Sequence, residues 1–307
     1  MRGGAIPVDS PLVSVIMPVR DGQAHLAEAI ASIGAQTLTA HEFLIIDDGS
    51  SDATPAILRA AAARDPRIRL LTREGAGIVA ALNLGLASAR ALFVARMDAD
   101  DMAPPDRLAR QVAFLRANPG IGAVGAGHTV IDPRGARLRG VVPPADPGAI
   151  RAALLVSNPM AHPTMLLRRE TVLAAGGYRD GFPFCEDYDL WLRLSEVTDL
   201  ANIPEPLLLY REHGGQETWR HLEGRLASEA AVLRAAERRR AGLAEETGTP
   251  GPEAIRDRAF LAARGALGEG RPEAAWIALH AARRQGRMSV MMALRWSRLA
   301  LRAWRMG

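Results

Sequence analysis

Three acidic side chains lie within four positions at the end of an apolar run, in the stretch ARMDADD, residues 95–101. Asp98, Asp100 and Asp101 carry like charges, which repel one another when they are held close together. Carboxylates spaced Asp-x-Asp suit a hard divalent cation such as Mg²⁺ or Mn²⁺, and a bound cation would relieve the repulsion. A solvated acidic turn has the same composition, so the motif alone leaves both interpretations open.

A second acidic pair, Asp47 and Asp48, follows the apolar run EFLII and precedes GSSDAT. Asp and Ser favour turns and helix N-termini, so this stretch could be only a junction between a strand and a helix. One carboxylate could also shape the turn while the other binds a ligand. The pair is therefore a candidate for binding as well as for local structure.

A third acidic stretch begins with Glu186 and Asp187 in EDYDLWLRL. Acids stabilise the positive end of a helix dipole, and that is one explanation for them. The other is that one carboxylate acts as a general base. Cys185, the one cysteine of the chain, precedes them without an adjacent His, so we expect a packed side chain rather than a nucleophile.

The elements that must position these acids alternate along the first half of the chain. Apolar runs predict strands at 12–19, 42–50, 67–72, 91–97 and 121–127. Helical patterns lie between them at 24–35, 51–64, 77–89 and 104–119. This alternation indicates an α/β fold with a mostly parallel sheet covered on both faces. Because ligands of such sheets bind beyond the carboxyl ends of the strands, we expect the first two acidic groups to face one crevice.

The rest of the chain changes character twice. Residues 128–215 predict a hairpin with PRG at its turn, a helix at 186–197 and a strand at 206–213. From residue 216 the sequence is helical and rich in Ala and Arg, interrupted by TGTPGP. We therefore predict a flexible N-terminus at 1–10, an α/β domain at 11–215 and an α-helical C-terminal extension at 216–307.

The composition excludes several classes of protein. All 38 basic residues are Arg, which excludes Schiff-base lysines and the P-loop lysine. A net charge of +4 is too small to predict a nucleic-acid partner. No segment reaches the roughly 18 unbroken apolar residues of a membrane span, and the N-terminus lacks a signal-peptide core. We expect a cytoplasmic protein, with peripheral contact at the inner face of the cell membrane as the alternative.

Eight stretches, in this order, resemble the family 2 glycosyltransferases, which have the GT-A fold, a Rossmann-like sheet that binds nucleotide sugars. They are VSVIMPVRDG, FLIIDDGSSDAT, REGAGIVAALNLGL, ARMDADD, HPTMLLRRE, GGYRD, EDYDLWLRL and YREH, within residues 12–213. The resemblance implies an inverting transfer of a sugar from a nucleotide-diphosphate donor to a glycan or lipid-linked hydroxyl. It also implies a place in cell-envelope or extracellular polysaccharide synthesis.

The resemblance assigns roles to individual residues. The positions implied for nucleotide-sugar binding are Pro18, Val19, Arg20, Asp47, Asp48, Arg73, Asp98 and Ala99. A divalent cation, Mn²⁺ or Mg²⁺, would be held by Asp98, Asp100 and His213. Asp187 matches the catalytic base, with Glu186 as its neighbour, and His162 and Arg211 fall near the acceptor or the diphosphate.

Two other classes fit part of this pattern. A sugar-phosphate nucleotidyltransferase also combines a doubly wound domain with nucleotides and acidic metal sites. Such enzymes open with a Gly-rich loop containing Arg and Lys, which MPVRDG is not. The other class is a non-catalytic nucleotide-sugar-binding relative, against which the intact acidic motif and the candidate base both argue.

The last twenty residues combine a basic stripe with an apolar face. The stripe consists of Arg295, Arg298, Arg302 and Arg305, and the face contains Met292, Trp296, Leu299 and Ala303. A helix of this kind can lie in an anionic membrane interface. Its alternative is to pack the apolar face on the catalytic domain or on a second subunit and leave the arginines in water.

If residues 288–307 attach the chain to membranes, the full chain will cosediment with anionic vesicles and the chain lacking these residues will stay in the supernatant. Vesicles of neutral lipid are the control, because they offer the arginines no opposite charge. Equal sedimentation of both chains, or of neither, would contradict attachment through this segment.

Overall fold

The computed structural model describes residues 10–214, 222–245 and 251–268, together with the single positions Ala275, Ala278, Leu279, Ala282 and Leu299. The chain divides into two compact units, and each is described by itself. The first contains the residues up to Arg179 and the segment Leu190–His213, and the second contains Asp180–Asp189 and the residues from Gly214 onward. The predicted boundary at 215/216 stays a prediction. The predicted basic tail lies outside the described residues, apart from Leu299.

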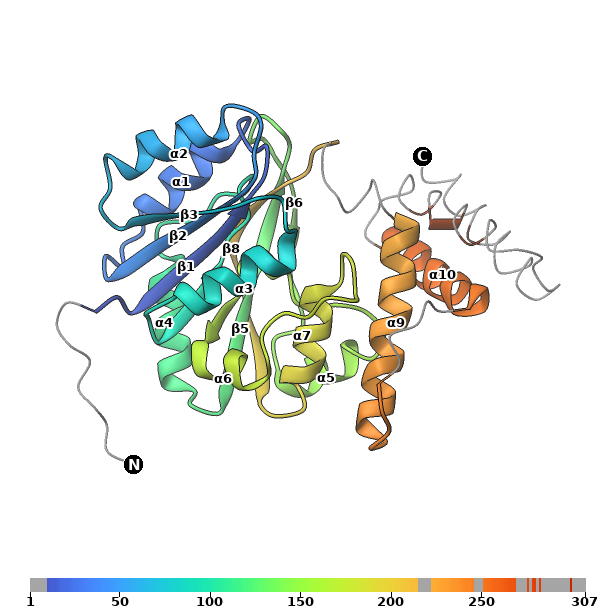
Figure 1. Cartoon of the computed structure of the whole chain (residues 1–307). Coiled ribbons are helices and arrows are strands. Elements are labelled where there is room, and N and C mark those ends of the chain that lie inside the picture. The colour runs from blue at the N-terminus through green and yellow to red at the C-terminus, as the bar shows by residue number, and fades with distance from the viewer. Residues whose placement is uncertain are drawn as a thin grey trace. The chain divides into compact units, whose positions relative to one another are not determined.

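The first unit is built on one mixed sheet of eight strands (Figure 1). The strands are β1 Val13–Val19, β2 His41–Asp48, β3 Ile68–Arg73, β4 Phe93–Arg96, β5 Ile121–Ile131, β6 Arg137–Val141, β7 Leu166–Arg168 and β8 Asp199–Arg211. Their order is β3-β2-β1-β4-β7-β5-β6, with β8 paired to β5. Strands β1 to β4 run parallel, β7 is antiparallel to both β4 and β5, and β8 is parallel to β5.

Helices connect the strands and cover the sheet. Those of the first half are α1 Leu26–Gly34, α2 Thr54–Ala62, α3 Ile78–Ser88 and α4 Arg107–Ala117. They are followed by α5 Pro147–Ala153, the 3₁₀ helix η1 His162–Thr164, α6 Arg169–Ala174 and α7 Glu186–Leu194. The alternation of strand and helix confirms the predicted α/β class and its mostly parallel sheet.

Both faces of the central strands are covered. Val13, Val15 and Met17 on one side of β1 lie in a core that also contains residues of α1 and α4. Ile16 points to the other side, where α3 crosses in front of the sheet in Figure 1. There, a Cβ added to Gly85 would lie 2.5 Å from Ile16 Cγ2, so a glycine is needed for this close approach. Covering on both sides explains why every residue of β1 and β2 is buried.

The structure revises some element bounds. Helix α7 ends at Leu194, three residues before the predicted end. The last strand is much longer than predicted, because β8 begins at Asp199 and is in register with β5 up to Ile203 and again from Pro206. Pro204 and Pro206 interrupt the alternating pattern there and hide the first half of the strand from a sequence analysis. The predicted hairpin is confirmed, since β5 and β6 pair around the turn that contains Gly135.

Among the described residues, the second unit contains residues 180–189 and the helices α9 Leu222–Arg240 and α10 Pro252–Gly268. Its buried apolar cluster includes Leu226 of α9 and Phe260 of α10. The Cys185 Sγ is buried and lies 3.7 Å from the Arg225 carbonyl oxygen. Burial raises the pKa of this thiol well above its ordinary value, as expected for a packed cysteine. Among the helices that the structure describes, none has the length and apolarity needed to cross a membrane.

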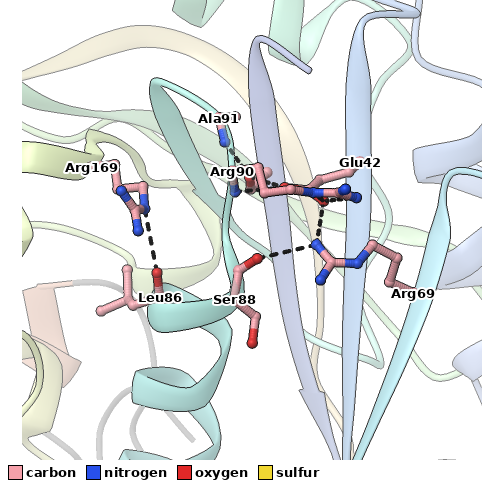
Figure 2. A network of polar contacts seen from close by, with 8 residues as sticks. Glu42, Arg69, Leu86, Ser88, Arg90, Ala91 and Arg169 are labelled. Carbon is pink, nitrogen blue, oxygen red and sulfur yellow. Dashed lines mark hydrogen bonds and ion pairs between the residues drawn. The ribbon is translucent and has the colours of Figure 1, made fainter. Parts of the chain in front are cut away.

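One buried carboxylate joins the amino ends of the first three strands (Figure 2). Glu42 of β2 is 4% exposed and accepts hydrogen bonds from Ser14 Oγ at 2.7 Å and from the Arg90 backbone N–H at 2.8 Å. The Arg69 guanidinium lies 2.6 Å from it, and that of Arg90 lies 3.0 Å away. Arg69 also donates to the Ser88 carbonyl, which ties the end of α3 to the strands.

We expect Glu42→Gln to lower the free energy of unfolding at pH 7 by about 2 kcal/mol, because charge-assisted hydrogen bonds are lost. Burial opposes ionisation of this carboxyl, but the hydrogen bonds outweigh burial, so its pKa is lowered in the folded chain. The stabilisation is therefore present above the unfolded-state pKa and lost as pH falls through the lower folded-state pKa. Urea unfolding at pH 7 and at pH 3 measures the difference in free energy of unfolding between the natural chain and Glu42→Gln. A difference that is as large at pH 3 as at pH 7 would contradict the prediction.

Candidate active site

The topology brings residues from four strands to one edge of the sheet. β1, β2 and β4 are parallel, so the residues that follow Val19, Asp48 and Arg96 emerge on the same side. β7 is antiparallel to both β4 and β5, which makes β5 parallel to β4, and β8 is parallel to β5. The end of β8 at Arg211 therefore reaches the same edge as the acidic motif, although 110 residues separate it from Asp101.

The acids of the motif form a tight cluster at this edge. Carboxylate oxygens of Asp98, Asp100 and Asp101 lie within 4.8 Å of one another. Asp98 contacts the guanidinium of buried Arg96 at 2.5 Å, and Asp100 contacts His213 Nε2 at 2.9 Å. Burial, followed by the charges of Asp98 and Asp100, raises the pKa of Asp101 well above its ordinary value. A cation bound between the three carboxylates would relieve their mutual repulsion.

The donor set fits a hard divalent cation. Asp101 is 1% exposed, and its Oδ1 accepts the Arg211 backbone N–H at 2.8 Å. Its Oδ2 is buried and has no hydrogen-bond partner among the described residues. A buried oxygen of this kind is costly unless something satisfies it, and Mg²⁺ and Mn²⁺ prefer carboxylate oxygens. This orphaned oxygen is the structural sign of a cation site.

The predicted cation ligands were Asp98, Asp100 and His213. The structure brings the two aspartates together, and it places His213 against Asp100, with the His213 ring 5.4 Å from that of His25. Asp101 was not among the predicted ligands. The third acid was visible in the motif, but its burial depends on the distant strand β8, which local sequence does not reveal.

Arg211 is the last residue of β8, and it is 1% exposed. Its guanidinium donates to the backbone carbonyls of Asp100 at 2.8 Å and Pro133 at 2.9 Å, and to Glu28 Oε2 at 2.6 Å. The predicted role near the acceptor or diphosphate stays a prediction. What the contacts show is a side chain surrounded by acceptors of the protein itself.

A cavity of about 700 Å³ opens beside the ends of β2 and β3. Its lining residues are Arg20, Asp47, Gly49, Ser50, Pro55, Leu58, Arg59, Leu70, Leu71, Thr72, Arg73, Glu74 and Gly75. Apolar walls with a few charged groups are typical of a small-molecule site. Of the residues predicted to bind the nucleotide sugar, Arg20, Asp47 and Arg73 line this cavity.

Other predicted nucleotide residues lie around it. Asp48 is buried, and its two carboxylate oxygens accept the backbone N–H groups of Ala76 and Gly77, each at 2.8 Å. It therefore folds the loop that follows β3, whereas the neighbouring Asp47 lines the cavity. Pro18 and Val19 are buried in β1. Ala99 is half-buried against the core, between the two aspartates of the motif.

Two loops at the cavity rim are locked together through Asp21. Its backbone has φ of 51°, a conformation that few residues other than glycine adopt. Its Oδ1 accepts the Ser51 N–H at 2.7 Å, and its own N–H donates to Ser50 Oγ at 2.9 Å. Gln23 adds a second link, because its Oε1 accepts the Ala53 N–H. The lock fixes the positions of Arg20 and Ser50. Because it joins two loops that are distant in the sequence, no local pattern predicts it.

The predicted catalytic pair opens α7, in the segment 180–189 of the second unit. Asp187 Oδ1 accepts the Tyr188 N–H at 2.7 Å. Glu186 is buried. Their roles as base and neighbour stay predictions.

His162, predicted near the acceptor or diphosphate, is a buried side chain of η1. Its Nε2 lies 2.7 Å from the Tyr178 hydroxyl, and Trp191 packs edge-on at 5.7 Å between ring centroids. Burial, helped by the charge of Arg96, lowers its pKa well below the ordinary value, so the ring is neutral near pH 7. These are the contacts of a packed histidine, and the acceptor role stays a prediction.

The edge of the sheet thus combines an acidic cluster with a cavity lined by arginines, as in nucleotide-dependent transferases. A sequence model of the family described as Glycosyl transferase family 2 matches residues 14–176, more than half of the chain. The chain therefore belongs to the family 2 glycosyltransferases, as its motifs implied. This membership separates it from the sugar-phosphate nucleotidyltransferases.

Individual relatives agree with the family. An uncharacterized glycosyltransferase of Haemophilus influenzae is 34% identical over 219 residues, which are 67% of this chain and 67% of the relative. The O-antigen biosynthesis glycosyltransferase WbnJ of Escherichia coli is 34% identical over 206 residues, 66% of this chain and 80% of the relative.

The fold is shared with solved structures. The mannosyltransferase PcManGT from Pyrobaculum calidifontis, in complex with GDP-Man and Mn²⁺, matches with a TM-score of 0.56 at 22% identity. The match covers 98% of this chain and 86% of that one. The predicted GT-A fold is confirmed.

Proposed function

We propose that the chain is an inverting, metal-dependent glycosyltransferase that moves a sugar from a nucleotide-diphosphate donor to a hydroxyl acceptor. The observation that carries this proposal is the acidic cluster with its orphaned Asp101 oxygen, at the sheet edge that also holds the arginine-lined cavity. Membership of the family supports the transfer of a sugar. The cluster supports the use of a diphosphate donor that carries a cation.

The donor's nucleoside would occupy the cavity. Its volume of about 700 Å³ is within the range of small-molecule sites. Asp47 can accept a hydrogen bond from a base N–H, since only one of its oxygens is shown to be used, by the Ser50 N–H at 3.0 Å. Arg20 and Arg73 supply positive charge for the phosphates. That PcManGT holds GDP-Man in the same fold supports a nucleotide sugar as donor.

The cation, Mn²⁺ or Mg²⁺, would be held by Asp98 and Asp100, with Asp101 and His213 beside them. When bound, it would act as a Lewis acid that neutralises the charge growing on the leaving diphosphate. The protein's own part is to hold the carboxylates in place and to keep the buried Arg96 against Asp98. Mn²⁺ in the PcManGT complex supports this assignment.

Asp187 would be the base that takes the proton from the acceptor hydroxyl as the hydroxyl attacks the sugar. Inversion needs one such base on the face opposite the leaving group, because no covalent sugar intermediate forms. Glu186 would orient the acceptor or support the base. The motif match at α7 supports these roles.

The acceptor would be a glycan or a lipid-linked glycan of cell-envelope or extracellular polysaccharide synthesis. WbnJ, an O-antigen biosynthesis glycosyltransferase, supports this class of product. A chain that works on lipid-linked acceptors would act in the cytoplasm at the inner face of the membrane. An assay of the purified chain with a panel of nucleotide sugars tests the whole proposal, and binding without any transfer or hydrolysis would favour the non-catalytic alternative.

We expect a chelator to abolish transfer and added Mn²⁺ to restore it. Asp100→Ala removes one ligand and should lower kcat by about 10²-fold or more, because stabilisation of the leaving diphosphate is lost. Asp106→Ala is the matched control, since Asp106 lies in the same connection, is 53% exposed and pairs only weakly with Arg110 at 3.7 Å. Full activity of Asp100→Ala in the presence of chelator would overturn the cation assignment.

We expect Asp187→Asn to lower kcat by about 10²-fold or more while donor binding persists. The substitution keeps an oxygen that can accept the Tyr188 N–H and removes only the basicity. Initial rates together with calorimetric donor binding measure the two effects separately. Glu186→Gln should cost less, and a larger loss in that variant would reverse the two assignments.

A further inference from the structure

We infer that Arg211, together with Glu28, is a positioning residue that holds the acidic cluster in the shape that binds the cation. The inference rests on the proposed function, because it assigns a second layer to the same cation site. It differs from the role near the acceptor or diphosphate, which would need the guanidinium to face the ligand. The contacts of Arg211 point to the protein instead.

Arg211 joins the segments around the cluster. Its backbone N–H donates to Asp101 Oδ1 at 2.8 Å, and its Nε donates to the Asp100 carbonyl at 2.8 Å. Its Nη1 donates to Pro133 in the β5–β6 turn at 2.9 Å, and its Nη2 donates to Glu28 of α1 at 2.6 Å. One residue thus fixes the backbone of one aspartate and the carboxylate of the next, relative to α1 and to the β5–β6 turn.

The hydrogen bond to Asp101 engages one of its carboxylate oxygens and leaves the other. Because Oδ1 is engaged by the Arg211 N–H, the buried Oδ2 is the one left without a described partner. Two residues further on, His213 contacts Asp100 Oδ2 at 2.9 Å. The end of β8 and the residues just beyond it therefore contact two carboxylates of the cluster. An error of one ångström in their placement is enough to weaken a site.

Positioning the cluster requires a guanidinium group, because a positive charge alone would not be sufficient. Its planar fork reaches three acceptors that lie in different directions, whereas an ammonium group is a single point charge. The side chain is 1% exposed, so water cannot replace a lost contact cheaply. The Glu28 side chain is 59% exposed, and its carboxylate lies 2.6 Å from the guanidinium. Arg211→Lys should therefore keep the charge and lose the geometry.

The test measures Mn²⁺ binding directly, by the loss of the free Mn²⁺ signal in electron paramagnetic resonance, without nucleotide. We expect the dissociation constant of Arg211→Lys to be about tenfold or more above that of the natural chain, in the range known for residues behind metal ligands. Glu28→Gln should shift it in the same direction by less. Binding of a nucleoside diphosphate in chelator should stay unchanged in both variants.

Arg168→Lys is the matched control. Arg168 also donates to backbone carbonyls, those of Ile121 at 2.9 Å and Leu115 at 2.6 Å, but it lies at the amino end of β5, away from the cluster. We expect it to lower the Tm without changing Mn²⁺ binding. An equal loss of Mn²⁺ binding in Arg168→Lys would mean that general destabilisation is the cause, and would overturn the inference.

Other outcomes are equally decisive. Unchanged Mn²⁺ binding in Arg211→Lys overturns the positioning role and leaves the proposed function intact. Weaker nucleoside diphosphate binding in chelator would overturn it in favour of direct contact with the diphosphate. No Mn²⁺ binding by the natural chain, either alone or with a nucleoside diphosphate present, would overturn the cation assignment itself and the positioning role with it. If Arg211→Lys does not fold, Glu28→Gln decides, because its side chain is more than half exposed.

Discussion

The repulsion among three carboxylates is the constraint on which the carboxyl edge of the sheet depends. Two unit charges at the separations found here repel by roughly 3 to 4 kcal/mol at an effective dielectric constant of 20. The chain offsets this with buried arginines. Arg96 contacts Asp98, and Arg107 is fully buried, with a pKa that burial lowers to about 10. Arg211 adds hydrogen bonds from its backbone N–H to Asp101 and from its Nε to the Asp100 carbonyl. Arg107 in turn donates to the Arg96 carbonyl at 2.7 Å.

This requirement explains why the sheet needs its last strand. The hydrogen bonds of Arg211, the last residue of β8, and the ring of His213, two residues beyond the strand, come more than one hundred residues after the motif. They reach it only because β7 reverses direction between β4 and β5 and so returns later strands to the original polarity. At the amino edge of the sheet there is a single buried acid, Glu42, and two arginines pair with it. A chain without lysine uses guanidinium forks at both edges, where each fork can satisfy several acceptors.

The sequence predicts the frame of this arrangement better than its details. Alternating apolar runs and helices predict the class and the carboxyl-edge location of Asp47 and Asp98, because the periodicity is local. It does not predict that Asp47 lines the cavity while Asp48 folds the next loop, since that depends on where the Ala76 and Gly77 N–H groups lie. It also misses Asp101, whose burial depends on Arg211. The missed features are contacts between loops, for which one sequence carries no local signal.

The charge balance also bears on how the proposed site would work. Glu28 matches the charge of Arg211, so the three aspartates face only the buried Arg96 and Arg107, and the cluster carries one excess negative charge before a cation arrives. A divalent cation would then leave a net positive site, and the nearest natural complement to that charge is the diphosphate of the donor. The arginines that reduce the repulsion among the carboxylates in the free protein thus also reduce the affinity of the cluster for a cation without the donor. On this argument the cation and the donor stabilise each other in the site, and the geometry held by Arg211 matters most when both are to be bound.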